Sequence, residues 1–432
     1  MSPRFALRAL GALVAATCAA TAMAQDFAVT NARVVIGDGS EPVENGTVVV
    51  RGGKVAAAGA GVAVPAGIRV IDAGGKWVTP GLVAALTDLG LLDVNGVEES
   101  NDHGPQHSLF NAALDVAPAV NPTTVPITVN RAGGVTRAAV APASGNAIFA
   151  GQGAVIDLGS DPHAVTGPRA FQFVEMGERG GRLAGGSRVA AHASLRNALA
   201  EARDVAANPT TRRDDALLTR RDAEALVPVI QGRQPLYVHV ERAHDIRAIL
   251  ALKTEFPALK LVIVGADEGW MAAREIAEAG VPVIANPLTD LPASFESLAA
   301  TQSNVGRMAA AGVKVAVGNL SDMRQPRYTP QYAGNLVALN RVPGATGLSW
   351  AKAFAAISSI PADILGQGER FGSLRPGRAG DVVIWDGDPL EVISGPVAVF
   401  IDGIEQPLAN HQTRLRDRYA TPGEGTLPKA YE

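Results

Sequence analysis

Short apolar segments alternate with helical patterns through the central part of the chain. This order is typical of a parallel α/β architecture, because the helix after each strand carries the chain back so that the next strand runs in the same direction. The eight predicted strands are 78–84, 136–141, 154–158, 171–175, 236–240, 260–264, 281–285 and 314–317. This pattern predicts a TIM-like (β/α)8 barrel.

Helices are predicted between several of these strands. Ser187 is a suitable N-cap for a helix that has Leu195 and Leu199 on one face. Residues 222–230 form a second predicted helix, directly before the fifth strand. These helices would form the outer layer of the barrel.

Short β-strands are also predicted at both ends of the chain. Four segments near the amino end alternate apolar and polar residues between glycines: 27–36, 46–58, 69–72 and 76–78. A matching stretch, 371–389, is followed by 397–402 near the carboxyl end. Alternation with glycines at the boundaries predicts antiparallel strands.

Composition limits the partners of the protein. A formal net charge of −4 provides no broad attraction for phosphate backbones or anionic lipid. We therefore expect a small-molecule substrate or ligand, no nucleic acid and no stable membrane anchor, and the sequence is compatible with a homo-oligomer. The single cysteine, Cys18, lies near the amino terminus, so no disulfide framework is expected in the rest of the chain.

The first 24 residues are typical of a secretory signal. Arg4 and Arg8 provide a positive region, 9–20 is apolar, and Ala22-Met23-Ala24 is a small-x-small cleavage site. The apolar run is shorter than the roughly 20 residues that a membrane span requires. We therefore expect cleavage before Gln25 and a periplasmic mature protein.

Two motifs resemble those of the amidohydrolase superfamily. Lys76–Asp88 contains the Thr-Pro-Gly-Leu run that in this superfamily is followed by a metal-binding His-x-His. Phe371–Pro389 contains a Gly-Ser-Leu-x-Pro-Gly turn that leads into a strand ending near Trp-Asp-Gly-Asp-Pro. Residues 145–156 are similar to a stretch of imidazolonepropionase-like members, and 412–419 extends the resemblance to the end of the chain.

The resemblance implies a barrel beside a small β-sandwich that both chain ends form. It divides the sequence into a signal peptide (1–24), the first part of the sandwich (25–79), the barrel (80–365), and the second part of the sandwich with the tail (366–432). It also implies hydrolysis of a non-peptide carbon–nitrogen bond in a small cyclic amide or amide-like substrate. In the superfamily the site lies at the C-terminal mouth of the barrel and uses one or two divalent metals.

The usual metal ligands are only partly present. The two His-x-His positions hold Leu86 and Asp88, and only Asp88 has an oxygen that can coordinate. Glu175 is a candidate bridging ligand at the fourth strand. The sixth strand has no histidine, and Asp267 or Glu268, which follow it, are alternative oxygen ligands. For Asp88 and Glu175, an ordinary position in a surface loop is the more frequent explanation.

His239 is the remaining candidate histidine ligand, because it ends the apolar fifth strand. A packed structural histidine explains the same position equally well. Glu241 and Arg242 flank the same mouth and are candidates for a substrate clamp or a simple salt bridge. Asp322, in the loop after the last strand, is the candidate proton carrier, with a turn-forming aspartate as the alternative.

His103 and His107 form an i, i+4 pair in the loop after the first strand. Gly104 and Pro105 lie between them and prevent a regular helix, so the geometry of a helical ligand pair does not apply. The pair is therefore a weaker candidate for metal binding than His239.

Two functions remain open at this point. The first is an exported amidohydrolase-like enzyme with a reduced or rebuilt metal site that holds one divalent ion (Zn, Mn or Fe) or none. The second is a catalytically inactive relative whose barrel serves as a binding or assembly module. The missing histidines favour the second, because each lost ligand weakens metal binding, whereas the family resemblance favours the first.

Overall fold

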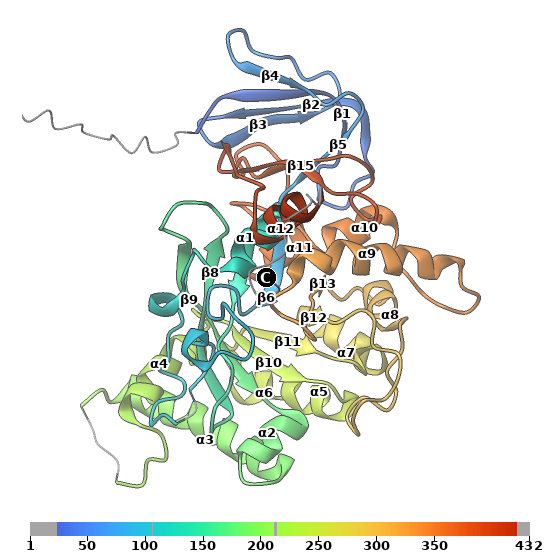
Figure 1. Ribbon diagram of the computed structural model, residues 1–432. Coiled ribbons are helices and arrows are strands. Elements are labelled where there is room, and N and C mark those ends of the chain that lie inside the picture. Colours follow the sequence, from blue (N-terminus) through green and yellow to red (C-terminus); the bar gives the residue numbers. More distant parts are fainter. Residues whose placement is uncertain (1–23, 106, 211–213, 421–432) are drawn as a thin grey trace, which may run out of the picture.

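The strands of the computed structural model form two sheets (Figure 1). The structure describes residues 24–105, 107–210 and 214–420, so all but the last residue of the predicted signal segment lies outside the described residues. One eight-stranded sheet curves into a barrel, and the other eight-stranded sheet lies beyond one end of it. The predicted TIM-like barrel with a separate β-rich unit is confirmed.

The barrel sheet contains all eight predicted strands in chain order. They are β6 (Leu82–Thr87), β7 (Val135–Val140), β8 (Phe149–Asp157), β9 (Val165–Glu175), β10 (Leu236–Val240), β11 (Leu261–Gly265), β12 (Val283–Ala285) and β13 (Val315–Val317). The last strand meets the first through a loop: the Val317 amide donates to the Ala356 carbonyl at 2.9 Å, and the Val83 amide to the Ile357 carbonyl at 3.0 Å. These two bonds close the barrel.

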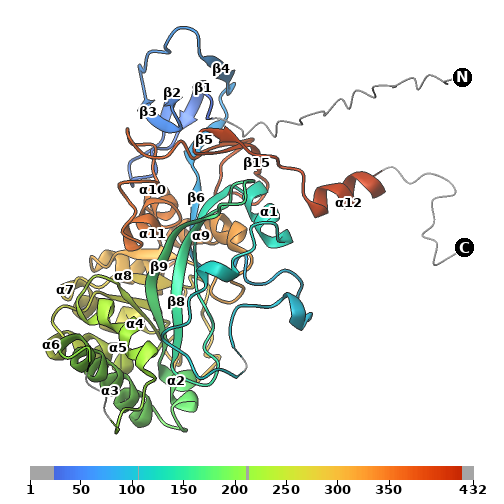
Figure 2. The same ribbon diagram turned by 90° about the vertical axis from the view of Figure 1, so that its left-hand side faces the viewer.

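The expectation that every strand is parallel is wrong at β8. This strand pairs antiparallel with both β7 and β9, and Figure 2 shows β8 and β9 as long neighbouring strands at the side of the barrel. The reason is the length of the connections 141–148 and 158–164, which are too short for the crossover that a parallel pair requires.

The predicted strand 78–84 is divided at Gly81. Val78 lies in β5 of the second sheet, and Leu82 begins β6 of the barrel. A Cβ atom at Gly81 would lie 2.0 Å from the Thr136 hydroxyl oxygen, so only glycine lets the chain pass this close to β7. The strand then continues to Thr87, which places Leu86 inside the barrel wall.

Apolar side chains fill the interior of the barrel. Phe171 and Tyr237 stack there with ring centroids 4.2 Å apart, and Leu86 belongs to the same buried cluster. Leu86 therefore contributes to packing rather than to a polar site.

Helices surround the barrel sheet and connect its strands (Figure 1). They are α1 (Val125–Ala132), α2 (Gly177–Leu183), α3 (Arg188–Ala207), α4 (Arg220–Ile230), α5 (Ala243–Leu250), α6 (Leu252–Glu255), α7 (Ala273–Glu278), α8 (Asn304–Ala310), α9 (Thr329–Ala338), α10 (Trp350–Ala355) and α11 (Ser359–Ile364). A further helix, α12 (His411–Tyr419), follows the last strand of the second sheet and extends away from the barrel in Figure 2. Ser187 caps α3 as predicted, and Leu195 and Leu199 are buried beneath it. Within the described ranges, no helix combines the length and hydropathy needed to cross a membrane.

Both ends of the chain contribute to the second sheet. From the amino end come β1 (Phe27–Val34), β2 (Val43–Arg51), β3 (Lys54–Gly59), β4 (Arg69–Asp72) and β5 (Trp77–Pro80); from the carboxyl end come β14 (Val382–Trp385), β15 (Pro396–Ile401) and β16 (Ile404–Glu405). Antiparallel pairing of β5 with β14 joins the two halves. Because β5 leads directly into β6, this sheet is continuous in sequence with the first barrel strand.

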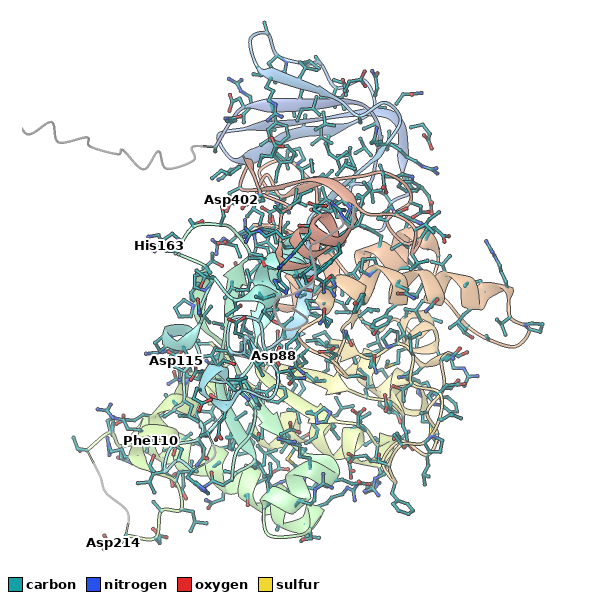
Figure 3. All side chains as sticks on the ribbon, in the orientation of Figure 1. Asp88, Phe110, Asp115, His163, Asp214 and Asp402 are labelled. Carbon is teal, nitrogen blue, oxygen red and sulfur yellow. The ribbon has the colours of Figure 1, made fainter. Side chains whose placement is uncertain are left out.

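A buried ion network ties the second sheet to the barrel. Arg137 of β7 donates to both carboxylate oxygens of Asp381, at 2.7 and 2.9 Å, and ion-pairs with Asp402 at 2.7 Å and with Asp157 at 3.8 Å. Only about 5% of the Arg137 side chain is exposed. Figure 3 shows Asp402 at the level where the two parts of the protein meet.

Candidate active site

Polar residues gather where the parallel barrel strands end. Asp88 follows β6, Glu175 ends β9, His239 lies near the end of β10, Asp267 follows β11, and Asp322 follows β13. The carboxyl ends of parallel strands meet at one end of a barrel, which is where barrel enzymes bind their substrates. The sequence-predicted site residues therefore occupy the same mouth.

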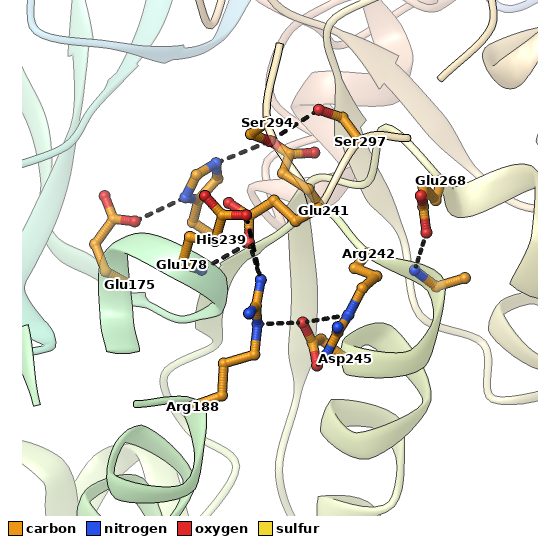
Figure 4. Close-up of polar contacts among 12 residues, drawn as sticks. Glu175, Glu178, Arg188, His239, Glu241, Arg242, Asp245, Glu268, Ser294 and Ser297 are labelled. Atoms are coloured by element: carbon orange, nitrogen blue, oxygen red, sulfur yellow. Dashed lines mark hydrogen bonds and ion pairs between the residues drawn. The ribbon is translucent and has the colours of Figure 1, made fainter. Parts of the chain in front are cut away.

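His239 lies between two carboxylates (Figure 4). Its Nδ1 is 2.7 Å from Glu175 Oε2, and its Nε2 is 3.0 Å from Glu241 Oε1. Burial lowers the pKa of His239, but the charges and hydrogen bonds of Glu175 and Glu241 outweigh burial and raise the pKa well above its ordinary value. The ring is therefore an imidazolium that donates from both nitrogens.

The two carboxylates are themselves held in place. Arg179 ion-pairs with Glu175 at 3.4 Å, and the Asp267 amide donates to Glu241 Oε2 at 2.8 Å. Gly265, with a φ of +94°, lets Glu241 approach the end of β11, because a Cβ atom there would lie 2.3 Å from a Glu241 oxygen. The missing side chain of Gly265 therefore leaves the space that the Glu241 carboxylate occupies at the end of β11.

Asp267 is the group in this cluster that titrates near neutral pH. Burial raises its pKa to about 7, and the negative charge of Glu241 acts in the same direction; the side-chain hydrogen bond of Thr289 and the charge of His239 oppose this shift. The sequence placed Asp267 at the end of a barrel strand but named it only as an alternative oxygen ligand. The role of Asp267 depends on its contact with Glu241, which follows a different strand, and this contact could not be predicted from the sequence.

Asp88 and Asp322 form a second cluster around Arg324. The Arg324 Nε lies 3.9 Å from Asp88 Oδ2 and 3.6 Å from Asp322 Oδ1. Burial raises the pKa of Asp88 to about 6, Arg324 opposes this shift, and the charge of Asp322 adds to it. One buried oxygen of each aspartate accepts no hydrogen bond from the residues that the structure describes. Arg324 was not identified from the sequence.

His103 links the two clusters electrostatically. It is half-buried, and burial together with the positive charges of Arg324 and Arg179 lowers its pKa. The charges of both clusters therefore act on His103. His107, the other member of the predicted histidine pair, is exposed.

Arg242 does not face Glu241, as Figure 4 shows. Its guanidinium pairs with Asp245 at 2.7 Å, and Asp245 also accepts from Arg188 at 2.9 Å. Of the two candidate roles, the Glu241–Arg242 salt bridge is not formed, because Glu241 bonds His239 instead. Arg242 therefore belongs to an ion-pair group with Asp245 and Arg188, and not to the His239 cluster.

The donor set at the mouth does not fit a metal ion. Among the described residues, no group of three or more His, Cys, Asp or Glu side chains is placed to hold one. Coordination by histidine needs a nitrogen lone pair, and both ring nitrogens of His239 are directed at carboxylate oxygens, at 2.7 and 3.0 Å, rather than at a free coordination position. Asp88, Glu175 and His239, the three predicted ligands, are instead divided between the Arg324 cluster and the His239 cluster.

Comparison with known proteins shows the family. The model described as amidohydrolase family matches residues 188–403, half of the chain, and the chain belongs to this family. Enzymes of the family typically use a metal ion, so the donor set described above departs from the family pattern. Amidohydrolase tasK of Hapsidospora irregularis is 47% identical over 60 residues, which are 14% of this chain and only 6% of that protein.

Several solved structures share the fold. An amidohydrolase from Thermotoga maritima MSB8 aligns with a TM-score of 0.76 and 23% identity, over 88% of this chain and 99% of that one. Molinate hydrolase aligns with a TM-score of 0.54 and 18% identity, over 94% and 98% of the two chains. N-isopropylammelide isopropylaminohydrolase from Burkholderia multivorans ATCC 17616 gives 0.51 and 17%, over 89% and 100%.

The raised pKa of Asp88 predicts a pH-dependent effect of replacing this residue. An acid whose pKa is higher in the folded protein destabilises the fold when it ionises, so the cost is absent below its ordinary pKa of about 3.8 and complete above about 6. We expect Asp88→Asn to be more stable than the wild type at pH 8 by about 1–3 kcal/mol and to lose this advantage at pH 4. Urea unfolding at both pH values measures the difference.

Asp214→Asn is the matched control, because Asp214 lies on a peripheral exposed loop, far from Asp88 in Figure 3. A stability change in Asp88→Asn that is the same at pH 4 and pH 8 would show that Asp88 is not destabilised by its burial.

Proposed function

We propose that the protein hydrolyses a non-peptide carbon–nitrogen bond in a small cyclic amide or amide-like molecule. Family membership and the polar mouth support a hydrolase, and the observation that carries the proposal is Asp267, a half-buried carboxyl group that follows a barrel strand, contacts Glu241 through its backbone amide and has a pKa of about 7. A group with this pKa accepts and returns a proton at neutral pH. Molinate hydrolase and N-isopropylammelide isopropylaminohydrolase, which share the fold, are both named as hydrolases.

In this reaction Asp267 acts first as a base and then as an acid. The carboxylate removes a proton from water as the water oxygen attacks the carbonyl carbon, and it then returns the proton to the departing nitrogen as the carbon–nitrogen bond breaks. The products are a carboxylic acid and an amine. No step requires a metal ion, which agrees with the donor set at the mouth.

His239 and Arg324, the positively charged groups of the two clusters at the mouth, have separate roles in the proposal. His239 is hydrogen-bonded to Glu175 and Glu241, and its charge lowers the pKa of Asp267. The Arg324 Nε lies 3.6 Å from Asp322 and 3.9 Å from Asp88, which is too far for a hydrogen bond. In the proposal, the N–H groups of Arg324 bind the oxyanion that forms on the carbonyl oxygen. Asp322, the proton carrier expected from the sequence, is assigned here to positioning Arg324.

We also propose that the protein is exported to the periplasm. The support is in the sequence: two arginines, an apolar run and a small-x-small cleavage site precede Gln25. Protein recovered from a periplasmic extract should therefore begin at or near Gln25.

This mature protein is the material for the test of the proposed activity. We expect amine release from at least one member of a panel of small cyclic amides, ureas and N-acyl amines. We also expect far less than stoichiometric metal by mass spectrometry, and no loss of activity or thermal stability in EDTA, because the described donors form no metal site. A control without chelator at any purification step excludes accidental stripping of metal.

Two outcomes would contradict these expectations in different ways. A stoichiometric metal whose removal abolishes activity would show that the mouth rearranges into a metal site. A folded protein that releases no amine from any compound, with or without added Zn, Mn or Fe, would support the alternative of a binding or assembly module on an amidohydrolase scaffold.

A further inference from the structure

A cavity of about 820 Å³ lies at the barrel end opposite the mouth. Its lining includes Pro235, Lys260, Pro282 and Lys314, each of which directly precedes a barrel strand. Parallel strands that end at the mouth begin at this opposite end, so the packed interior of the barrel separates the cavity from the candidate active site. The proposed hydrolysis makes no use of this cavity.

The cavity concentrates positive charge. Its cationic lining residues are Arg169, Arg233, Lys253, Lys260 and Lys314, and among the described residues that line it only Asp363 is acidic. The whole chain has a formal net charge of −4, so this surface has the opposite sign to the protein that carries it. A concave surface with low-dielectric walls strengthens the field that such charges produce, which favours binding of anions.

The protein neutralises this charge only in part. Lys314 pairs with Asp363 at 3.0 Å, and both side chains are about half exposed, so a competing anion can displace this contact at little cost. Lys253 donates to the Ala279 carbonyl at 2.6 Å, which fixes the position of its ammonium group without cancelling its charge.

Arg169 is held in place by its backbone as well as by its side chain. Its φ of +52° lies in the left-handed region, which is unfavourable for a non-glycine residue and persists only where the surroundings enforce it. The Gln234 amide donates to the Arg169 carbonyl at 2.8 Å, and the Arg169 guanidinium pairs with Asp115 at 2.8 Å. Arg233 beside it donates to the neutral Gln231 side chain.

The floor of the cavity is apolar, with Leu261, Val262, Ile364 and Leu365 among its lining residues. A volume of this size falls in the range of small-molecule sites, which combine an apolar wall with a few placed polar groups. We propose that the cavity is a binding site for a small multivalent anion, either a polycarboxylate or a phosphorylated compound. The ammonium and guanidinium groups bind the anionic groups, and the apolar floor accommodates the carbon skeleton.

Calorimetric titration of the full chain with citrate and with inorganic pyrophosphate, at constant ionic strength, tests this proposal. The double variant Lys260→Gln/Lys314→Gln removes two cations of the lining. Lys54→Gln/Lys76→Gln, in the second sheet, is the control with the same change in net charge. We expect saturable binding of at least one probe to the wild type, a Kd raised about tenfold or more in the first variant, and an unchanged Kd in the control.

The identity of the probe that binds distinguishes a polycarboxylate site from a phosphate site. Absence of saturable binding by both probes would overturn the proposal, as would an equal loss of affinity in the two double variants, which would indicate general attraction by surface charge. Arg233→Gln provides a second variant of the lining if the first one fails to fold. Amine release at the mouth is measured separately, so failure of one proposal does not imply failure of the other.

Discussion

Asp267→Asn is expected to reduce kcat/KM for the proposed amide hydrolysis by about 10²–10⁴-fold, the usual contribution of a general acid–base group. Asparagine has nearly the same shape but neither accepts the proton of the attacking water nor returns it to the leaving nitrogen. The pKa of Asp267 is about 7, so wild-type kcat/KM should rise with pH up to about 7 and then level. The variant should retain only a low activity that lacks this rise. Initial rates of amine release from pH 5 to 9 measure both effects.

Two further variants separate catalysis from damage to the site. Asp161→Asn changes an exposed aspartate in the loop between β8 and β9, at the barrel end opposite the mouth, and should leave the pH profile unchanged. Glu241→Gln keeps a side chain over Gly265 but removes the charge that raises the pKa of Asp267, so it should move the rise in kcat/KM to lower pH. If Asp267→Asn retained the wild-type profile, another group would have to carry the proton.

The position of His239 was predictable, whereas its chemical state was not. A run of apolar residues ending in a polar one places that residue at a strand end, and the strand order of a barrel then places it at the mouth. Its state depends on Glu175, which reaches it from the neighbouring strand β9, and on Glu241, two residues further along the chain. A histidine with one free nitrogen has a position open to a metal, whereas both nitrogens of His239 already bond carboxylates, and the sequence alone does not distinguish these cases.

The contact of Arg324 with Asp88 could not be predicted from the sequence either, because both residues lie in loops. Arg324 follows β13 and pairs with Asp88, which follows β6, so the contact joins two loops that are far apart in sequence. Loop sequences lack the periodicity from which strands and helices are predicted, and the path of the loop decides which side chains meet. The antiparallel direction of β8 was easier to predict. Once the strand bounds are known, the connections 141–148 and 158–164 are too short for helical crossovers.

Arg137→Met is expected to lower the free energy of unfolding by about 3–5 kcal/mol, the typical cost of removing one partner from a buried ion pair. Methionine fills part of the volume but leaves Asp381 and Asp157 buried without their cation. Burial already raises the pKa of Asp157 to about 6 in the presence of Arg137. Ionisation of an acid with a raised pKa destabilises the fold, so the deficit of the variant should be largest above pH 7 and should shrink as the pH falls toward 5. Urea unfolding across this pH range measures it.

The double variant Arg137→Met/Asp381→Asn tests whether the unpaired charge causes this loss. Removing the stranded carboxylate should recover part of the stability, because a buried pair that is replaced as a unit costs far less than a pair that is broken. Arg51→Met breaks an exposed ion pair with Asp26 and should cost less than about 1 kcal/mol. A deficit in Arg137→Met that neither depends on pH nor responds to Asp381→Asn would mean that lost packing, rather than stranded charge, destabilises the junction between the second sheet and the barrel.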